Sequence, residues 1–296
     1  MDGIIVIDKQ KGISSSFAVR KFAKQFKISS AGHAGTLDPM ATGVLVAGLG
    51  KGTRILRFLE AMDKVYTGTI QLGSATDTDD AEGATVEELP VLRLTENDIV
   101  NVLTKYTGEI KQLPPSYSAI KIDGKRAYKS ARAGETPKLA LRDVTVHSIK
   151  LLSFDNVAYT IQISVHCSKG TYIRSLARDI SRALGTCGHL SSLRRESVGL
   201  FDLSRAIPFP SEVTKEQVDN SLISISDALK GLQSYVVADT DIVNIKMGRT
   251  VLLKERVSDA EDALVKSSAG EAICIASVRN ISATGESYLQ PQRMLV

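Results

Sequence analysis

The segment GHAGTLDPMATGVLVAGLG, residues 32–50, places a single carboxylate, Asp38, between a glycine-rich turn and an apolar run. His33 is the other ionisable group in this segment, and five glycines surround the pair. A solvated loop would carry more polar residues, whereas a buried strand would carry no carboxylate. We therefore expect residues 44–50 to form a buried strand or the start of a buried helix, and the preceding loop to carry Asp38 to the floor of a cleft.

Four roles are open to Asp38 from residue type alone: nucleophile, general base, metal ligand or turn cap. A metal would need further ligands, and the segment supplies only His33. Glycosidase chemistry would need a second carboxylate, and none is near in sequence. The Asp–Pro pair also suits a simple turn. Gly32, Gly35 and Gly43 favour the cleft interpretation, because glycine lets a bulky planar ligand approach the backbone closely. The sequence has neither a P-loop nor a dinucleotide-binding glycine motif here.

Length and composition indicate a folded protein. The chain has 296 residues, 43% hydrophobic and 24% charged, which fits a globular protein with one large domain or a large and a small one. No apolar run is long enough to span a bilayer, and the N-terminus does not have the pattern of a signal peptide. The three cysteines are far apart in sequence, which favours reduced thiols in the cytoplasm and argues against a structural zinc site.

Positive charge is concentrated in the first two-thirds of the chain. Bases dominate the first 30 residues, residues 121–142 and residues 168–195, whereas residues 74–88 carry six acids and no base. Residues 235–296 are nearly balanced, with seven bases and eight acids. Clustered bases suit a polyanion such as nucleic acid, although solvated helix and loop faces would give the same pattern.

Hydrophobic periodicity predicts an α+β fold with a mostly antiparallel, mixed sheet flanked by helices. We expect loops at residues 74–88 and a basic, extended excursion at about 112–142. The expected strands are 3–8, 65–73, 143–152 and 156–167, and the expected helices are 15–27, 94–108, 170–185 and a short one near 224–232.

A domain boundary is expected near residue 233. The polar, proline-containing stretch 208–222 precedes it, and short alternating segments with little helical pattern follow it. We therefore predict a large domain at 1–232 and a small β domain at 233–296.

Three further side chains are candidates for the same cleft as Asp38. Tyr172 and Arg174 are two residues apart, so an extended backbone would project both to one side. An arginine near Asp38 would hold it ionised and orient it, although Arg174 would also suit an exposed first turn of a helix. Tyr66 begins an expected strand, where its ring would serve either as core or as a stacking platform for a base.

Several of these motifs together resemble the TruB family of tRNA pseudouridine synthases. The matching segments are GHAGTLDPMATGVLVAGLGKGTR (32–54), KVYTGTIQLG (64–73), TDTDDAEG (76–83), QLPPSYSAIKIDGKRAYKSARAG (112–134), KGTYIRSLARDI (169–180) and HLSSLRR (189–195). The resemblance extends over about residues 3–200. It implies a pseudouridine synthase catalytic domain followed by a small PUA-like RNA-binding domain, and isomerisation of uridine 55 in the T-loop of tRNA to pseudouridine.

The resemblance also implies roles for individual residues. Asp38 matches the catalytic aspartate, Tyr66 the tyrosine that stacks on the target base, and Arg174 the arginine that pairs with the aspartate. Gln10 stands where the family usually has proline after the lysine of its first strand motif. The residues expected to bind substrate or RNA are His33, Tyr172, Leu193, Lys9, Arg54 and Arg178.

The isomerisation involves no redox change or net hydrolysis, so we expect no cofactor and no metal. The expected partner is tRNA, with no membrane association, and the simplest expected state is a monomer in the cytoplasm. Two alternatives stay open: a non-catalytic RNA-binding or RNA-folding protein on the same scaffold, and a synthase that acts on another RNA, for example within a guide-RNA complex.

Overall fold

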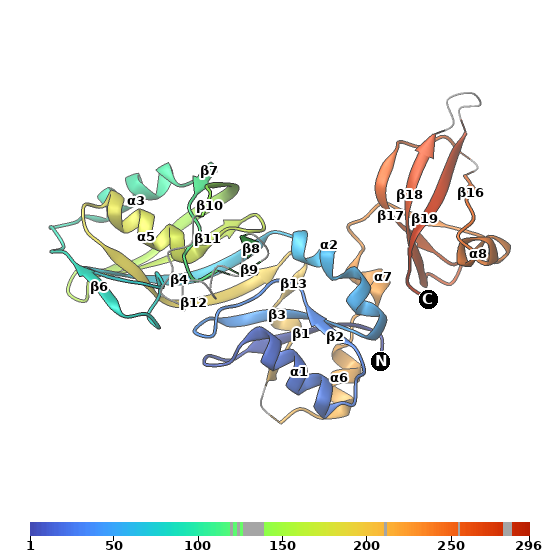
Figure 1. Ribbon diagram of the computed structural model, residues 1–296, viewed down its shortest axis with the longest axis horizontal. Coiled ribbons are helices and arrows are strands. Elements are labelled where there is room, and N and C mark those ends of the chain that lie inside the picture. The colour runs from blue at the N-terminus through green and yellow to red at the C-terminus, as the bar shows by residue number, and fades with distance from the viewer. Residues whose placement is uncertain (119–120, 123–124, 127–138, 210–211, 254, 281–285) are drawn as a thin grey trace.

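The computed structural model describes residues 1–118, 121–122, 125–126, 139–209, 212–253, 255–280 and 286–296 (Figure 1). Most of the expected excursion at 112–142, including residues 127–138, therefore lies outside the described residues. The helices are α1 (Ser15–Gln25), α2 (Leu56–Ala61), α3 (Glu96–Lys105), α5 (Ile173–Ala183), α6 (Lys215–Ser221), α7 (Ile225–Ala228) and α8 (Asp239–Lys246). Short 3-10 turns cover Gly50–Ile55 and Leu203–Arg205.

One large mixed sheet runs in the order β14-β1-β3-β12-β4-β11-β10-β7, with β2 beside β3 and β13 beside β12. Its pairs are antiparallel except for β1 with β14 and β3 with β12, which confirms the expected α+β fold with a mostly antiparallel sheet. The strands are β1 (Gly3–Lys9), β2 (Ala31–His33), β3 (Thr42–Leu49), β4 (Lys64–Leu72), β7 (Gly108–Gln112), β10 (Arg142–Asp155), β11 (Thr160–Cys167), β12 (Gly188–Val198), β13 (Phe201–Asp202) and β14 (Ala206–Phe209).

Strands β1 and β3 are apolar along their length because both of their faces are covered. Leu45, Ala47 and Leu49 of β3 join the core beneath α1, whereas Val44 and Val46 face a second core. Continuous apolar runs are typical of strands buried on both sides. The segment 44–50 therefore forms the expected buried strand, and it fixes where the preceding turn can lie.

The predicted helices form with ends slightly inside the expected limits. Ser14 caps α1, and Thr95 forms a capping box with Asp98 at the start of α3. Helix α5 buries Ile173, Leu176 and Ile180 in the same core as α1. In Figure 1, α3 and α5 lie together over the part of the sheet that holds β4, β10 and β11.

Four features of the structure were not expected from the sequence. The acidic stretch 74–88 contains a hairpin of β5 (Ser74–Thr76) and β6 (Thr85–Glu88), not only a loop. A short hairpin of β8 (Lys121–Ile122) and β9 (Lys125–Arg126) lies within the excursion. Helix α6 forms within the polar stretch 208–222 because Thr214 and Gln217 make a capping box. Helix α8 forms in the region where we expected short strands.

The C-terminal part of the chain forms a second sheet in the order β15-β17-β18-β19-β16, at the right of Figure 1. Leu264, Ile275 and Leu295 pack into the same core as Ile4 and Val6 of β1, so this sheet is anchored to the larger one. The strands are β15 (Ser234–Val236), β16 (Val251–Leu252), β17 (Ala260–Lys266), β18 (Ala272–Asn280) and β19 (Ser287–Met294). None of the helices in the described ranges has the length and apolar character needed to cross a membrane.

Gly43 tests the close packing of β3 on β12. Its φ is +99°, and a Cβ atom there would lie 2.2 Å from the carbonyl oxygen of Arg195. We expect Gly43→Ala to lower the free energy of unfolding by about 3 kcal/mol or more, because backbone strain adds to a clash that cannot relax. Gly185→Ala is the matched control, since its φ is +80° and a Cβ there meets nothing within 4 Å.

The control should cost only about 1–2 kcal/mol, the strain of a left-handed residue. Denaturant unfolding of both variants measures the difference. Equal losses of stability would show that the contact between β3 and β12 is looser than the structure indicates.

Candidate active site

A cavity of about 610 Å³ opens where the turn between β2 and β3, the start of α5 and the strands β4 and β12 meet. Six of the residues that line it are a carboxylate, two arginines, two tyrosines and a leucine. These six residues are Asp38, Tyr66, Tyr172, Arg174, Leu193 and Arg195. The structure thus brings five of the sequence-predicted site residues into one cavity.

The turn that carries Asp38 is held by contacts with buried partners. The Ser15 hydroxyl donates to the Leu37 carbonyl at 3.0 Å and accepts from the Leu37 N–H at 2.8 Å. The ammonium group of Lys9 donates to the Pro39 carbonyl at 3.3 Å, and the Gly12 N–H donates to the same oxygen at 2.8 Å. The backbone on both sides of Asp38 is therefore fixed without use of its side chain.

The carboxylate of Asp38 faces Arg174. Arg174 Nε lies 2.9 Å from Asp38 Oδ2, and Arg174 Nη2 donates to Asp38 Oδ1 at 3.3 Å. The Asp38 side chain retains 34% of its exposure, whereas the Arg174 side chain retains 5%. The carboxylate thus contacts a buried cation and remains open to the cavity.

Arg174 is fixed by partners on other elements. Its Nη1 donates to the Thr78 carbonyl at 2.8 Å and lies 3.5 Å from the buried carboxylate of Asp80. Its Nη2 also donates to the Tyr117 carbonyl at 2.9 Å. The acidic hairpin β5–β6 therefore contributes Asp80 to the site.

The sequence suggested that Arg174 lies either beside Tyr172 on an extended segment or in the exposed first turn of a helix. The structure differs from both. Tyr172 is the N-cap of α5 and Arg174 lies in its first turn, so the two side chains are not neighbours on an extended segment. The first-turn position is nevertheless buried, because the hairpin and Tyr117 cover it. Burial of a first-turn arginine reflects these long-range contacts, which sequence spacing does not reveal.

Burial raises the pKa of Asp38 above its ordinary value, and the charge of Arg174 partly opposes that rise. The neighbouring carboxylate of Asp80 adds to the rise. Desolvation of a carboxylate disfavours its charged form, whereas the positive charges of Arg174 and, to a smaller extent, Lys9 favour it.

Two tyrosines and a leucine form the remaining wall. Tyr66 points inward from β4 and is 8% exposed, and burial raises its pKa, so it is a neutral phenol at physiological pH. The Tyr172 N–H donates to Gln112 Oε1 at 2.8 Å, and Gln112 Nε2 donates back to the Tyr172 carbonyl at 3.1 Å. Leu193 of β12 is buried beside them.

Two expected RNA-binding residues lie away from the cavity wall. His33 is on β2, with Nε2 3.3 Å from the Ser16 hydroxyl. Lys9 has no exposed surface, and it donates to the Gln10, Ile13 and Pro39 carbonyls at 3.0, 2.8 and 3.3 Å. Lys9 therefore supports the Asp38 turn, and its expected contact with RNA stays a prediction.

The two remaining expected RNA-binding residues, both arginines, also have partners within the protein. Arg54 Nη1 donates to the Met294 carbonyl at 2.8 Å, which places Arg54 at the contact with the second sheet. Arg178 pairs with Asp79 and Asp179, each at 2.9 Å. The geometry gives both residues structural contacts, and their expected contacts with RNA stay predictions.

Sequence reasoning missed Asp80 and Arg195. Arg195 is 1% exposed and donates to the Val44 carbonyl at 2.7 Å and to the Gly35 carbonyl at 3.1 Å, on either side of the Asp38 turn. Both residues lie in segments that carried the family resemblance, TDTDDAEG and HLSSLRR. Their place in these two segments was the only feature of the sequence that could have identified them. The local charge pattern does not distinguish them from surface residues.

The mixed sheet, the cavity-facing carboxylate of Asp38 paired with a buried arginine, and the adjoining tyrosine rings suit an enzyme of the pseudouridine synthase class. Residues 23–173 match the model of the TruB family pseudouridylate synthase N-terminal domain. The chain is 47% identical to tRNA pseudouridine synthase B of Corynebacterium efficiens over 80% of this chain and 79% of that protein. A protein with the same name from Aromatoleum aromaticum is 43% identical, over 78% and 74%. The chain belongs to the TruB family, so it is an isomerase.

Solved structures agree on the fold. A structure of an H/ACA RNP bound to a substrate RNA containing 2'-deoxyuridine superimposes with a TM-score of 0.76 at 21% identity, covering 99% of this chain and 85% of that one. A Cbf5-Nop10-Gar1 complex gives 0.75 at 22% identity, with the same coverage. At these identities the similarity establishes the shared architecture, including the second sheet.

Lys9 provides a test of how the Asp38 turn is held. Burial lowers the pKa of Lys9 to about 8, so the ammonium group is still largely charged at neutral pH, where it satisfies three carbonyls. We expect Lys9→Met to lower the free energy of unfolding by about 3 kcal/mol, because those acceptors lose a charged donor. Lys24→Met, at an exposed position on α1, should change stability by less than about 0.5 kcal/mol.

Denaturant unfolding at pH 7 gives both values. If the two lysine variants were equally stable, Lys9 would not be a support of the turn.

Proposed function

We propose that this protein converts uridine 55 in the T-loop of tRNA to pseudouridine, with Asp38 as the essential catalytic group and Tyr66 and Arg174 beside it. The observation that carries this proposal is the Asp38–Arg174 ion pair at the floor of the cavity. The tRNA substrate is supported by the names of relatives at 43–47% identity, and uridine 55 by the motifs of the family.

The reaction requires a group that can act next to the sugar–base junction. The N1–C1′ bond breaks, the base turns, and a C5–C1′ bond forms, after which a proton leaves C5. An ionised carboxylate can attack the sugar or the base covalently, or it can assist loss of a ribose proton along a glycal route. Both routes need the Asp38 carboxylate deprotonated and oriented, which is what Arg174 provides.

The aromatic wall suits an extruded base. Removing a base from a folded RNA loop costs a few kcal/mol. Stacking on aromatic side chains returns about 1–3 kcal/mol per base, and Tyr66 and Tyr172 are the rings available in the cavity. Leu193 and the buried Tyr66 also keep this wall poor in water, which protects a detached, reactive ribose.

The two alternatives from the sequence are less well supported. A non-catalytic RNA-binding protein would have no need for a carboxylate whose backbone, counter-ion and aromatic neighbours are all fixed. A guide-RNA enzyme has support only from structures at 21–22% identity, and these show the fold alone.

We also propose that residues 233–296 form a PUA-like RNA-binding domain. We further propose that the protein acts on tRNA without a cofactor, as a cytoplasmic monomer.

The central substitution is Asp38→Asn. It keeps the size of the side chain and removes the negative charge, so we expect no measurable pseudouridine in an unmodified tRNA transcript, with tRNA affinity within about threefold of the parent protein. Asp219→Asn, at an exposed position on α6, is the matched control and should retain full activity. Pseudouridine mapping after a fixed incubation, with a filter-binding assay alongside, gives both quantities. Turnover within tenfold of the parent protein would contradict the role of Asp38.

The pH dependence of catalysis tests the purpose of Arg174. Because burial raises the pKa of Asp38 and Arg174 opposes this, loss of the arginine should raise that pKa further. Asp38 then loses its charge at a higher pH as the solution is acidified. We expect the acidic limb of the single-turnover rate in Arg174→Gln to move up by about one pH unit or more.

Arg182→Gln is the control, because the exposed Arg182 pairs with Glu87 away from the cavity. Its profile should overlay that of the parent protein. A lower plateau in Arg174→Gln with an unmoved acidic limb would show that Arg174 positions substrate and does not tune Asp38.

A further inference from the structure

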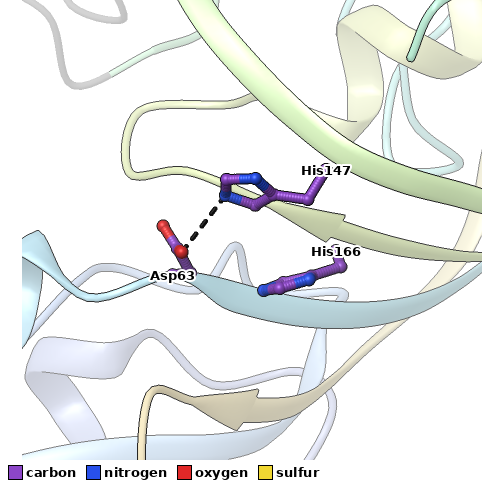
Figure 2. A group of neighbouring side chains, drawn as sticks. All are labelled: Asp63, His147 and His166. Atoms are coloured by element: carbon purple, nitrogen blue, oxygen red, sulfur yellow. Dashed lines mark ion pairs between the residues drawn. The ribbon is translucent and has the colours of Figure 1, made fainter. Parts of the chain in front are cut away.

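Three potential metal ligands converge on the sheet at a place that the proposed reaction does not use. They are Asp63, His147 and His166, and their ligand atoms all lie within 4.8 Å of one another (Figure 2). His147 Nε2 lies 3.1 Å from Asp63 Oδ2, and the two imidazole rings have centroids 4.6 Å apart. Figure 2 shows both rings extending toward the carboxylate from neighbouring segments.

The strand register places these side chains on one face. His166 of β11 is paired with Val65 of β4, and Asp63 lies two residues before Val65, so the alternation of a strand puts Asp63 and His166 on the same side. His147 lies where the pairing of β10 with β11 shifts between Val146 and Ser148. A β-bulge changes the direction of the side chain at that position. Here the bulge coincides with the packing of the His147 ring against His166.

This face is the reverse of the cavity wall. Lys64 and Tyr66, which alternate with Asp63 and Val65 along β4, both line the cavity. The backbone of Asp63 is itself fixed, because its carbonyl accepts from the Gly199 N–H at 2.8 Å. A metal bound here would link the segment before β4 to the neighbouring strands β11 and β10, on the face opposite the cavity.

We propose that Asp63, His147 and His166 bind one divalent transition metal ion of the zinc class, with water in the fourth position. Two imidazole nitrogens and one carboxylate oxygen are a ligand set that Zn²⁺ and its neighbours favour over Mg²⁺ or Ca²⁺. Sequence reasoning did not find this site. The expectation of no metal rested on the scattered cysteines, on the surroundings of Asp38 and on the chemistry of the isomerisation.

The geometry can close around an ion with side-chain movement alone. Bonds of about 2.0–2.1 Å in a tetrahedral site put ligand atoms about 3.3 Å apart. The Asp63–His147 pair is already at 3.1 Å, and the wider separations need rotation of side chains that have room to turn, since Asp63 and His147 are 46% and 37% exposed. The same exposure gives an ion direct access from solvent.

The test is calorimetric titration of the chelator-treated full chain with ZnCl₂. We expect one strong site in the parent protein, and a loss of affinity of at least about tenfold in His147→Ala and in His166→Ala. His189→Gln is the control, because His189 is remote from the cluster, paired with Gln71 on another part of the sheet, and its Nδ1 donates to the Ser74 carbonyl at 2.8 Å. It should bind Zn²⁺ as the parent protein does.

Co²⁺ provides a second readout that a nonspecific surface ion would not give. The parent protein should show the visible absorption of a four-coordinate Co²⁺ site, and Asp63→Asn should weaken it. Thermal unfolding should also shift upward with Zn²⁺ in the parent protein and not in His166→Ala. The proposal is overturned if the parent protein shows no binding at micromolar Zn²⁺, or if binding survives the changes at His147 and His166. None of these readouts depends on pseudouridine formation.

Discussion

The structure depends on one ion pair placed where water is scarce. A carboxylate that loses much of its hydration tends to take up a proton, and the charge of Arg174, which lies against Asp38, opposes this with a smaller contribution from Lys9. The arginine in turn is held by carbonyl groups and by Asp80, from segments distant in sequence. The turn, the first turn of α5 and the acidic hairpin are therefore coupled through a single guanidinium group.

The scaffold behind the ion pair is built to keep the Asp38 turn still. Lys9 and Ser15 bind its backbone from one side, and Arg195 binds the carbonyls of Gly35 and Val44 from the other. Gly43 allows β3 to approach β12 at a distance that no side chain would permit. Charged side chains thus replace water inside this part of the sheet, and each is matched by acceptors, as buried polar groups require.

Local sequence patterns predicted the elements well and the site only in part. The apolar run at 44–50 and the helical spacing of α1, α3 and α5 depend on nearby residues, so periodicity finds them. The hairpin at 74–88 was not predicted, because its acidic residues suggest a solvated loop. In the structure, Asp80 is buried against Arg174. The burial of Lys9 was not predicted either, because it depends on carbonyl groups that come together only in the folded turn. The Asp63 cluster joins three separate segments, and no local pattern contains it.

The most direct test of the central claim is the structure of the Asp38→Asn protein with a tRNA T-loop bound. The account predicts uridine 55 turned out of the loop, its ring against Tyr66, and the side-chain oxygen of residue 38 about 3–3.5 Å from C1′ or C6, a near-attack distance. A bound RNA whose uridine stays stacked in the loop, or lies outside the cavity with residue 38 remote from every nucleotide, would contradict it.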